Sequence, residues 1–313
     1  MDVSVIIINY NTIRLTIQCI QSILDFTTGV TYEIIVIDNN SGDDIEAAVA
    51  EHFGGCDIDI TCKKLDGNIG FGRANNEGFK IAHGRNVFCL NPDTILKNNA
   101  IKILSDFIDA HPEAGVCGGN IYSLDMQPNH SFKRFLPGFE WEWHLLTFQK
   151  FEKLFYGNGT EFNNTGKPME VGYITGADMM MRRSDAEHLG GFSPEFFMYY
   201  EETDLCLRMR KSGKKIVSVP EARIVHLEGA SFGKRETSIN KGAIERSEVG
   251  RLTYYRLNKS LPERCIINAV YRLALCVNKL YFKARGNDIW KYYEYKQTAY
   301  KEARKILKDK WQA

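Results

Sequence analysis

The feature that most restricts the fold is a series of short, continuous apolar runs near the start of the chain, of which the first two are rich in β-branched residues. Val3–Asn9 is the first, Glu33–Asp38 the second and Asn86–Leu90 the third. Runs of this kind are typical of parallel strands that are buried on both faces. Between the first two, Ile13 and Ile17 begin a helical spacing after a polar start. The alternation of strand and helix predicts an α/β fold with a mainly parallel central sheet flanked by helices.

Polar residues follow each of these strands where it ends. Asn9 and Asn11 close the first run, Asp38 closes the second, and Asn91 and Asp93 close the third. In parallel sheets, ligands bind at the carboxyl ends of the strands. Three polar strand ends at one sheet edge therefore indicate a binding site. Each of them taken alone is better explained as a plain turn, because Asn and Asp are common turn formers.

The later part of the chain is less regular. Residues 122–168 predict a long functional loop with one short helix. Val171–Arg182 and Lys215–Val219 return to strand character, and Glu201–Ser212 predicts a helix. From Ser247 onward the pattern predicts basic helices. The expected domains are a catalytic domain at 1–240, with halves at 1–120 and 121–240, and a basic helical C-terminal extension at 241–313.

The C-terminal segment differs from the rest of the chain in charge. Residues 251–313 hold 15 Lys and Arg against 5 Asp and Glu, which leaves 25 against 34 for residues 1–250. This asymmetry indicates an anionic partner surface for the segment. Interleaved cations and aromatic residues are typical of an interfacial helix on anionic lipid, although a structural helical cap with a solvated basic face explains them equally well. The aromatic residues are Tyr281, Phe282, Trp290, Tyr292, Tyr293 and Trp311. We expect no nucleic-acid partner, because the sequence matches no recognised nucleic-acid-binding fold.

The cysteines and the apolar stretches indicate the compartment. The eight cysteines include no Cys-x-x-Cys pair, and several lie in apolar runs, which favours a reducing compartment and argues against a zinc site. The N-terminus shows no basic and then apolar leader. Arg272 interrupts Cys265–Val277, so no stretch is expected to span a bilayer. These features predict a cytoplasmic protein that is at most peripheral on the inner face of the plasma membrane.

Four acidic or imidazole side chains are candidates for catalysis or metal binding. Asp93, fixed at a strand rim, could bind a divalent cation that grips a diphosphate, and a tight turn explains it equally well. Glu201 and Glu202 open a helix after an aromatic run, and an apolar surround suits a general base. Carboxylates are favoured at helix N-termini whatever the function, so a structural role competes. His226 ends another apolar run, where a metal ligand competes with a packed histidine.

Two further segments suggest phosphate binding. The glycines of Asp66–Gly78 permit close backbone approach, and Arg73 could reach a phosphate. The segment is not a dinucleotide fingerprint, because Asn75 stands at the third glycine position and the loop does not follow the first strand. This excludes a Rossmann dehydrogenase. Ser231–Arg235, which contains Lys234, suits a lid over a diphosphate or a solvated linker.

Taken together, these motifs resemble those of the family-two inverting glycosyltransferases, and most closely those of bacterial rhamnosyltransferase-like enzymes of surface polysaccharide synthesis. The resemblance covers roughly residues 3–235, and its strength lies in the order of the motifs. The motifs are Asn9-Tyr-Asn11, Val36-Ile-Asp38-Asn39, Asn68-x-Gly70-x-Gly72-Arg-Ala-Asn75-Asn76, Asn91-Pro-Asp93, Thr175-Gly176-Ala177, Phe197-Met-Tyr-Tyr-Glu-Glu-x-Asp204-Leu-Cys-x-Arg208 and His226-x-x-Gly229.

The resemblance implies an A-type nucleotide-sugar fold, in which a parallel sheet binds the nucleotide and a mixed half binds the acceptor. It implies that Asp93, with His226, holds Mg²⁺ or Mn²⁺, and that Glu202 is the catalytic base, with Glu201 as the alternative. The nucleotide-sugar-binding residues implied are Asn9, Asn11, Asp38, Asn68, Gly70, Arg73, Asn91 and Lys234. The acceptor residues implied are Gly176, Ala177 and Asp204.

Two departures from the family pattern affect the expected activity. Asn91 replaces the first Asp of the family's Asp-x-Asp motif, so the metal should bind weakly. Glu202 stands where the family usually has Asp, and a shift of about 1 Å in a catalytic carboxylate costs on the order of 100-fold in rate. The expected function is transfer of one sugar, with inversion, from dTDP-rhamnose or a UDP-sugar to a saccharide or lipid-linked saccharide.

Two alternatives compete with this function. One is a catalytically weakened, glycosyltransferase-like binding protein, for which Glu202 is the evidence. The other is a processive polysaccharide synthase, which the absence of the Gln-x-x-Arg-Trp motif and of predicted membrane spans argues against.

Overall fold

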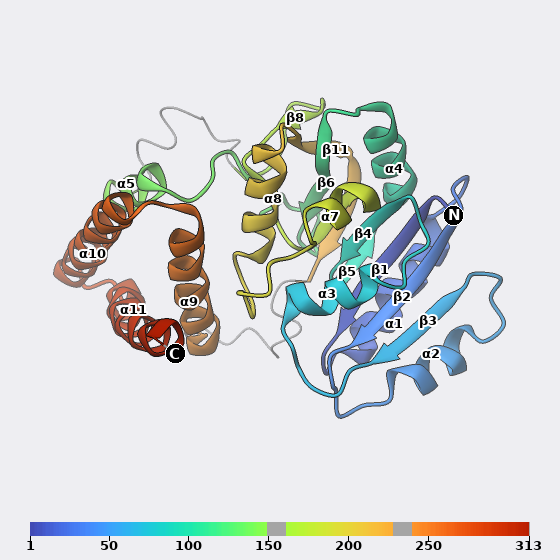
Figure 1. Cartoon of the computed structure of the whole chain (residues 1–313), viewed down its shortest axis with the longest axis horizontal. Coiled ribbons are helices and arrows are strands. Elements are labelled where there is room, and N and C mark those ends of the chain that lie inside the picture. The colour runs from blue at the N-terminus through green and yellow to red at the C-terminus, as the bar shows by residue number, and fades with distance from the viewer. Residues whose placement is uncertain (149–160, 228–239, 313) are drawn as a thin grey trace. The chain divides into compact units, whose positions relative to one another are not determined.

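The computed structural model describes residues 1–148, 161–227 and 240–312, and the chain divides into two compact units. The first, called the sheet unit here, comprises Met1–Arg134, Glu161–Pro194 and Glu202–Arg235. The second, called the helical unit, comprises Phe135–Thr160, Glu195–Glu201 and Glu236–Ala313 (Figure 1). The helical unit thus takes in two segments from within the range predicted for the catalytic domain.

The sheet unit is built on a central sheet whose described strands follow the order β3-β2-β1-β4-β10-β6-β11-β5, with β8 paired to β11. One half is parallel and consists of β1 (Val3–Asn9), β2 (Tyr32–Asp38), β3 (Ile60–Lys64) and β4 (Asn86–Leu90). The other half is mixed. It consists of β5 (Thr94–Leu96), β6 (Ala114–Tyr122), β8 (Met169–Glu170), β10 (Asp178–Arg182) and β11 (Lys215–His226). A separate pair joins β7 (Phe132–Lys133) to β9 (Tyr173–Ile174).

The first predicted strand coincides with β1, and all seven of its residues are buried. Its alternate residues face opposite sides of the sheet. Val5 belongs to the core cluster that contains α1 side chains, whereas Ile6 contacts Gly78 of α3. A Cβ at Gly78 would lie 2.6 Å from Ile6 Cγ2, so this glycine allows α3 to approach the strand closely. A strand covered on both faces must be apolar throughout, which explains the continuous run in the sequence.

Helices of the sheet unit join the strands and cover the sheet. In α1, the buried side chains Cys19, Ile20 and Ile23 recur at helical spacing and join the main core cluster. The start of α2 is fixed by Asp44, whose carboxylate accepts a hydrogen bond from the Ala47 amide. The helices are α1 (Ile13–Phe26), α2 (Ile45–Phe53), α3 (Phe71–Phe79), α4 (Ala100–Ala110), α7 (Arg183–His188) and α8 (Glu201–Lys211).

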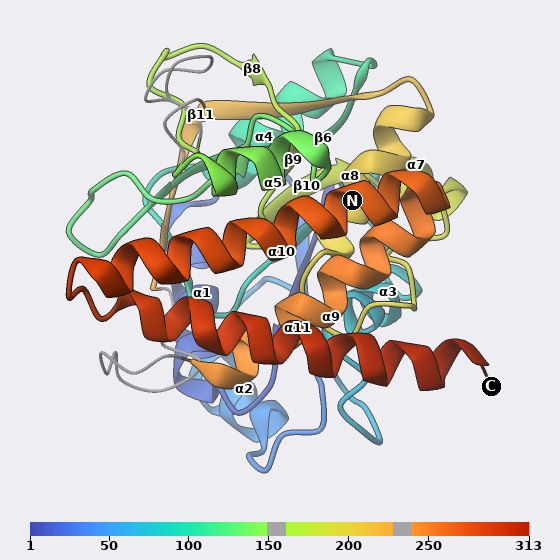
Figure 2. The same cartoon turned by 90° about the vertical axis from the view of Figure 1, so that its left-hand side faces the viewer.

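The helical unit consists, in its described residues, of α5 (Phe139–Leu146), α9 (Lys241–Asn258), α10 (Leu261–Ala284) and α11 (Ile289–Gln312). Ser260 and Glu263 form a capping box that fixes the start of α10. Helices α10 and α11 lie side by side (Figure 2). By length and composition α10 is able to cross a membrane, which differs from the expectation that Arg272 would interrupt such a segment.

Candidate functional site

A buried hydrogen-bond network joins the carboxyl ends of β1 and β2. Asn9 and Asp38 are paired in the strand register, and Asn9 Nδ2 donates to Asp38 Oδ1 at 2.9 Å and to Ser41 Oγ at 3.0 Å. Asn9 Oδ1 accepts hydrogen bonds from the hydroxyls of Thr12 and Thr16. Ser41 Oγ donates to Asp38 Oδ1 at 2.5 Å. Asn9 and Asp38 were both predicted to bind the nucleotide sugar. In the structure they are buried and hold the ends of β1 and β2 together through hydrogen bonds.

The loop before α3 is tied to the same sheet edge. Asn39 Nδ2 donates to Asn68 Oδ1 at 3.0 Å, and Asn39 Oδ1 accepts from the Ile69 amide at 2.9 Å. Gly70, at φ 89°, caps the helix and donates its amide to Asn68 Oδ1. That φ value favours glycine. Asn11 lies at φ 56° and is exposed, with its side-chain oxygen accepting from a backbone amide of the same edge.

Arg73, predicted to line the nucleotide pocket with Asn68 and Gly70, is held by the segment that follows α7. Its Nε donates to the Pro194 carbonyl at 2.8 Å, and its Nη2 donates to the same oxygen. The side chain borders a cleft of about 480 Å³ between α3 and the turn after α7. The cleft is lined by Ile69, Arg73, Asn76, Glu77, Phe79, Lys80, Ala186, Glu187, Gly190 and Gly191. The structure thus brings Asn68 and Gly70 to the strand ends and Arg73 to this neighbouring cleft.

Three predicted side chains converge where β4 ends and β5 begins. The antiparallel register of β11 and β5 places His226 opposite Thr94. His226 Nε2 consequently lies 3.1 Å from Asp93 Oδ1 and 3.4 Å from Asn91 Nδ2. Asp93 and His226 are largely buried, with 6% and 16% of their side chains exposed. Residues separated by more than 130 positions in sequence therefore form one polar cluster.

This cluster fits a divalent cation in part. A carboxylate, an imidazole and a side-chain amide are ligands that Mg²⁺ or Mn²⁺ accepts, but Asn91 is neutral where a second carboxylate would add charge. Among the described residues, no group of three or more His, Cys, Asp or Glu side chains is arranged to hold a metal. A cation at Asp93 and His226 would therefore need oxygen ligands from a bound substrate to complete its shell.

The predicted acceptor loop lies beside this cluster. The Asn91 amide donates to the Ala177 carbonyl at 3.0 Å, which ties the end of β4 to the start of β10. A Cβ at the preceding residue, Gly176, would lie 3.8 Å from Glu202 Cβ. Glu202 is half-buried in the first turn of α8, and Thr203 Oγ1 donates to its Oε1 at 3.0 Å. The structure thus connects Glu202 to the polar cluster through Gly176, Ala177 and Asn91.

The other two acidic residues of α8 have different surroundings. Glu201 is 4% exposed and belongs to the helical unit, so the unit boundary falls between Glu201 and Glu202. Asp204 Oδ2 accepts from Arg208 Nε at 2.7 Å, and Arg208 also donates to the carbonyls of Leu189 and Gly191. Asp204, predicted as an acceptor residue, therefore holds Arg208 against the turn after α7.

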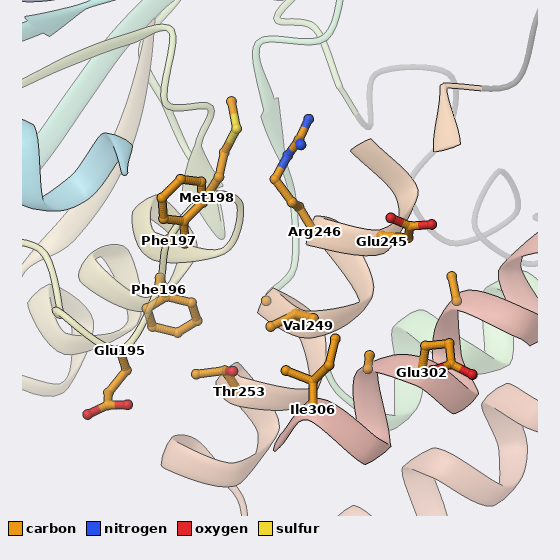
Figure 3. A pocket seen from close by; sticks show the side chains of 13 residues that line it. Glu195, Phe196, Phe197, Met198, Glu245, Arg246, Val249, Thr253, Glu302 and Ile306 are labelled. Atoms are coloured by element: carbon orange, nitrogen blue, oxygen red, sulfur yellow. The ribbon is translucent and has the colours of Figure 1, made fainter. Parts of the chain in front are cut away.

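The aromatic run before α8 lines a cavity of about 420 Å³ within the helical unit. Figure 3 shows Phe196, Phe197 and Met198 on one side, with α9 and α11 on the other. Phe196 is buried and Phe197 is 47% exposed. The sequence predicted these aromatics as the apolar surround of the carboxylates that follow, whereas the structure uses them to close this cavity.

Sequence reasoning missed three residues of the site region. Ser41 is a hub of the strand-end network, and Lys64 Nζ lies 3.3 Å from the Ser41 carbonyl and 3.9 Å from Asp38. Asp178 follows Ala177, and burial raises its pKa well above the ordinary value although the Gly119 amide donates to it. Two features of the sequence could have pointed to the first two of these residues. Ser41 belongs to the polar turn after β2, and Lys64 is the last residue of β3, which is parallel to β2. The predicted residue Lys234 lies outside the described residues.

Comparison with known sequences gives one family match and several relatives. Residues 4–190 match the model of glycosyl transferase family 2. The chain is 38% identical over 68 residues to N-acetylglucosaminyl-diphospho-decaprenol L-rhamnosyltransferase of Mycobacterium tuberculosis, which covers 22% of each chain. It is 24% identical over 212 residues to rhamnosyltransferase WbbL of Escherichia coli, covering 62% of this chain and 72% of that one. The match to the mycobacterial relative thus spans about a fifth of that protein's length.

Comparison with solved structures shows the fold. The mannosyltransferase PcManGT of Pyrobaculum calidifontis, solved with GDP-Man and Mn²⁺, superimposes with a TM-score of 0.60 at 15% sequence identity. The superposition covers 99% of this chain and 87% of that one. The A-type fold that the sequence motifs implied is confirmed by this likeness.

Proposed function

The chain belongs to glycosyl transferase family 2, and we propose that it transfers one sugar from a nucleotide diphosphate sugar to a saccharide or lipid-linked saccharide, with inversion. One observation carries the proposal. The cluster of Asn91, Asp93 and His226 lies at the carboxyl end of a parallel strand and is joined through Ala177 to the helix that begins beside Glu202. A diphosphate site and a base site are thereby adjacent. Two relatives are named as rhamnosyltransferases, which favours dTDP-rhamnose over a UDP-sugar as donor.

Asp93 and His226 are the side chains that we assign to Mg²⁺ or Mn²⁺, together with the donor's diphosphate. When bound, the cation supplies positive charge that stabilises the departing nucleotide diphosphate. Asn91 holds the cluster in place through its backbone bond to Ala177. We place the nucleotide on the strand end that Asn68 and Gly70 line and that the buried side chains of Asn9 and Asp38 support from beneath.

Glu202 is the residue that we assign as general base. Its carboxylate takes the proton from the acceptor hydroxyl, and the oxygen attacks the anomeric carbon on the face opposite the diphosphate. The bond between the anomeric carbon and the diphosphate oxygen breaks, and the nucleotide diphosphate leaves. A single displacement inverts the anomeric configuration. We propose that the reaction takes place in the cytoplasm, at the inner face of the plasma membrane, where the nucleotide sugar meets the lipid-linked acceptor.

The experiment that tests the proposal begins with a thermal-shift screen of nucleotide sugars, with Mn²⁺ or Mg²⁺ added. A donor at about 100 times its dissociation constant stabilises a protein by about 2.7 kcal/mol. The donor identified in this way is then used for transfer assays on wild type, Glu202→Gln and Glu201→Gln. We expect Glu202→Gln to lower kcat by roughly 100-fold or more, with donor binding retained.

Each outcome of these assays has a clear meaning. Normal turnover by Glu202→Gln together with an inactive Glu201→Gln would reassign the base. Retention of the anomeric configuration, measured on the product by NMR, would contradict the single displacement. Donor binding without transfer or hydrolysis in wild type would favour the alternative, a binding protein that has lost catalysis.

A further inference from the structure

Helix α10 carries an apolar stripe that the described parts of the chain leave exposed. Ile266, Leu273 and Leu280 are 55%, 53% and 65% exposed. Ala269 and Cys276 are exposed between them. The five positions follow one another at steps of three and four residues, so they lie along one side of the helix. An exposed stripe of this length usually marks an interaction surface.

The opposite side of α10 is anchored inside the helical unit. The Tyr271 ring centre lies 3.6 Å from the Arg251 guanidinium carbon, and Tyr271 donates its hydroxyl hydrogen bond to Glu248. Asn278 Nδ2 donates to the Leu145 carbonyl at 3.0 Å. A helix that crossed a bilayer would have to expose these polar contacts to lipid, which is costly. The arrangement therefore suits a helix that lies along a membrane rather than through it.

The charges of α10 indicate which partner the stripe takes. Glu263 in the first turn is its one acidic residue, and the exposed cations Arg272, Lys283 and Arg285 follow it along the helix and its C-cap. Two copies of this face brought together would set cations against cations, which disfavours a dimer. An anionic lipid surface complements both the stripe and its cations.

Two more exposed apolar side chains lie at and beyond the C-terminal end of α10. Tyr281 is 38% exposed, with the Arg285 guanidinium 4.7 Å from its ring centre, and Ile289 beyond the turn is 46% exposed. Amphipathic aromatics and cations are typical of the lipid headgroup region. By contrast, Phe282 and Tyr293 stack on each other at 5.7 Å and contribute to packing. The exposed face is therefore mainly aliphatic, unlike the aromatic set that the sequence indicated.

We propose that the exposed face of α10 docks on an anionic lipid bilayer, with Ile266, Leu273 and Leu280 inserted among the headgroups and Arg272, Lys283 and Arg285 bound to lipid phosphates. This proposal rests on the location given under the proposed function and names the surface that would contact the membrane. Vesicle binding is measured without sugar transfer, so the two proposals can fail separately.

The first test is co-sedimentation of the full chain with phosphatidylcholine vesicles, with and without phosphatidylglycerol. We expect binding to the anionic vesicles that weakens as salt is raised. Leu273→Glu should lower the partition coefficient roughly tenfold or more, because it puts a charge in place of a leucine that the proposal inserts into the bilayer. The matched control is Leu124→Glu, since Leu124 is 68% exposed and lies in the sheet unit. That variant should bind vesicles like wild type.

The second test uses the exposed cysteines, which are Cys265 and Cys276, both on α10. Cys265→Ser leaves Cys276 for labelling with an environment-sensitive fluorophore, whose emission should shift to the blue on anionic vesicles. Either of two results would overturn the proposal: no binding to anionic vesicles, or unchanged binding by Leu273→Glu. A wild-type dimer in sedimentation velocity that Leu273→Glu dissociates would reassign the stripe to self-association. Transfer to a soluble acceptor should be the same in Leu273→Glu and wild type.

Discussion

In the proposed metal site, the side chain at position 91 determines how many ligands the protein itself provides. Asn91 Nδ2 lies 3.4 Å from His226 Nε2, and Asp93 is the one carboxylate of the cluster. We predict that Asp93→Asn weakens Mn²⁺ binding in the presence of nucleotide by at least roughly 10- to 100-fold, because removal of an outer-shell partner alone costs that much. Isothermal titration with Mn²⁺ and the nucleoside diphosphate measures this without any turnover.

Two matched variants sharpen this measurement. Asn91→Asp restores a second carboxylate beside His226 and should tighten Mn²⁺ binding relative to wild type. Asp125→Asn removes an exposed carboxylate from a turn after β6 and should leave binding unchanged. If Asp93→Asn bound Mn²⁺ as wild type does, or if transfer were undiminished by a strong chelator, Asp93 and His226 would not form the metal site.

Asp178 makes the stability of the sheet unit depend on pH. It is fully buried, and burial raises its pKa well above the ordinary value in spite of the Gly119 amide hydrogen bond. The unfolded chain releases this proton near pH 4, whereas the folded chain keeps it until a higher pH. Stability from this group is therefore fully present below about pH 4 and is lost as pH rises toward the folded-state pKa.

Asp178→Asn removes that titration while keeping the shape of the side chain. We predict that the variant gains unfolding free energy relative to wild type as pH is raised from about 4 to about 8, by about 1.4 kcal/mol for each unit by which the folded-state pKa exceeds that of the unfolded chain. Urea unfolding at a series of pH values measures the difference. A difference that stayed constant over this range would show that Asp178 does not retain its proton.

At the scale of elements, the turn of the helical unit at Tyr199 and Tyr200 packs closely against α9. Tyr199 and Tyr200, directly before α8, have φ values of 71° and 73°, a left-handed conformation that is strained for tyrosine. Gly250 of α9 faces this turn, and a Cβ there would lie 2.5 Å from the Tyr199 carbonyl oxygen. The missing side chain of Gly250 therefore allows the turn to pack where it does, immediately before Glu201 and Glu202.

We predict that Gly250→Ala displaces this turn and costs about 1–3 kcal/mol of stability from overpacking. If Glu202 is the base, kcat should fall by roughly 10- to 100-fold while donor affinity in the thermal-shift assay is unchanged. Gly242→Ala is the matched control on the same helix, because its nearest contact would be the flexible end of Arg246 at 3.3 Å. That variant should be neutral or slightly stabilising. Equal losses of kcat and donor affinity in Gly250→Ala would indicate general unfolding instead of positioning.

The sequence specified the elements whose pattern is local. The runs at β1, β2 and β4 were predictable because strands covered on both faces must be apolar throughout. Strand β3 was missed because it is an edge strand with intermediate and exposed residues that ends in Lys63 and Lys64. Strand β11 was seen only in its first half, since Pro220 and a register shift between Ser218 and Arg223 interrupt its pattern.

The site was predictable in its residue types and less so in its contacts. The resemblance paired Asp93 with His226, but the local residue patterns did not, because their contact depends on the long-range register of β11 against β5. Asp204 matched a motif position, and its pairing with Arg208 is a local i,i+4 contact within α8, whereas the bonds from Arg208 to the Leu189 and Gly191 carbonyls are tertiary contacts. Which side of α10 is exposed likewise depends on which side the neighbouring helices bury. The spacing of apolar residues in the sequence does not show this.

At the scale of the whole molecule, the two units have separate centres. The helical unit is organised around Arg251, which is 5% exposed and pairs with Glu142 of α5 and Glu248 of α9 at 3.1 Å each. Burial alone would lower the pKa of Arg251, but Glu248 and Glu142 hold it well above its ordinary value. The guanidinium also lies over the Tyr271 ring of α10. One cation thus links three helices of this unit, whereas the sheet unit is centred on the apolar cluster around β1.

Because each unit has its own core, we predict two transitions in differential scanning calorimetry. Arg251→Leu leaves two buried carboxylates without their cation, so it should destabilise the helical unit by about 3–5 kcal/mol and lower one transition while the other keeps its Tm. Arg256→Leu is the control on the same helix, where the exposed guanidinium lies 4.3 Å from the Trp311 ring centre, and should cost less than about 1 kcal/mol.

Asp178→Asn should move the transition of the sheet unit alone. A single transition shifted by both Arg251→Leu and Asp178→Asn would mean that the two units unfold as one cooperative body, in which case the vesicle-binding face and the transfer site could not be destabilised independently.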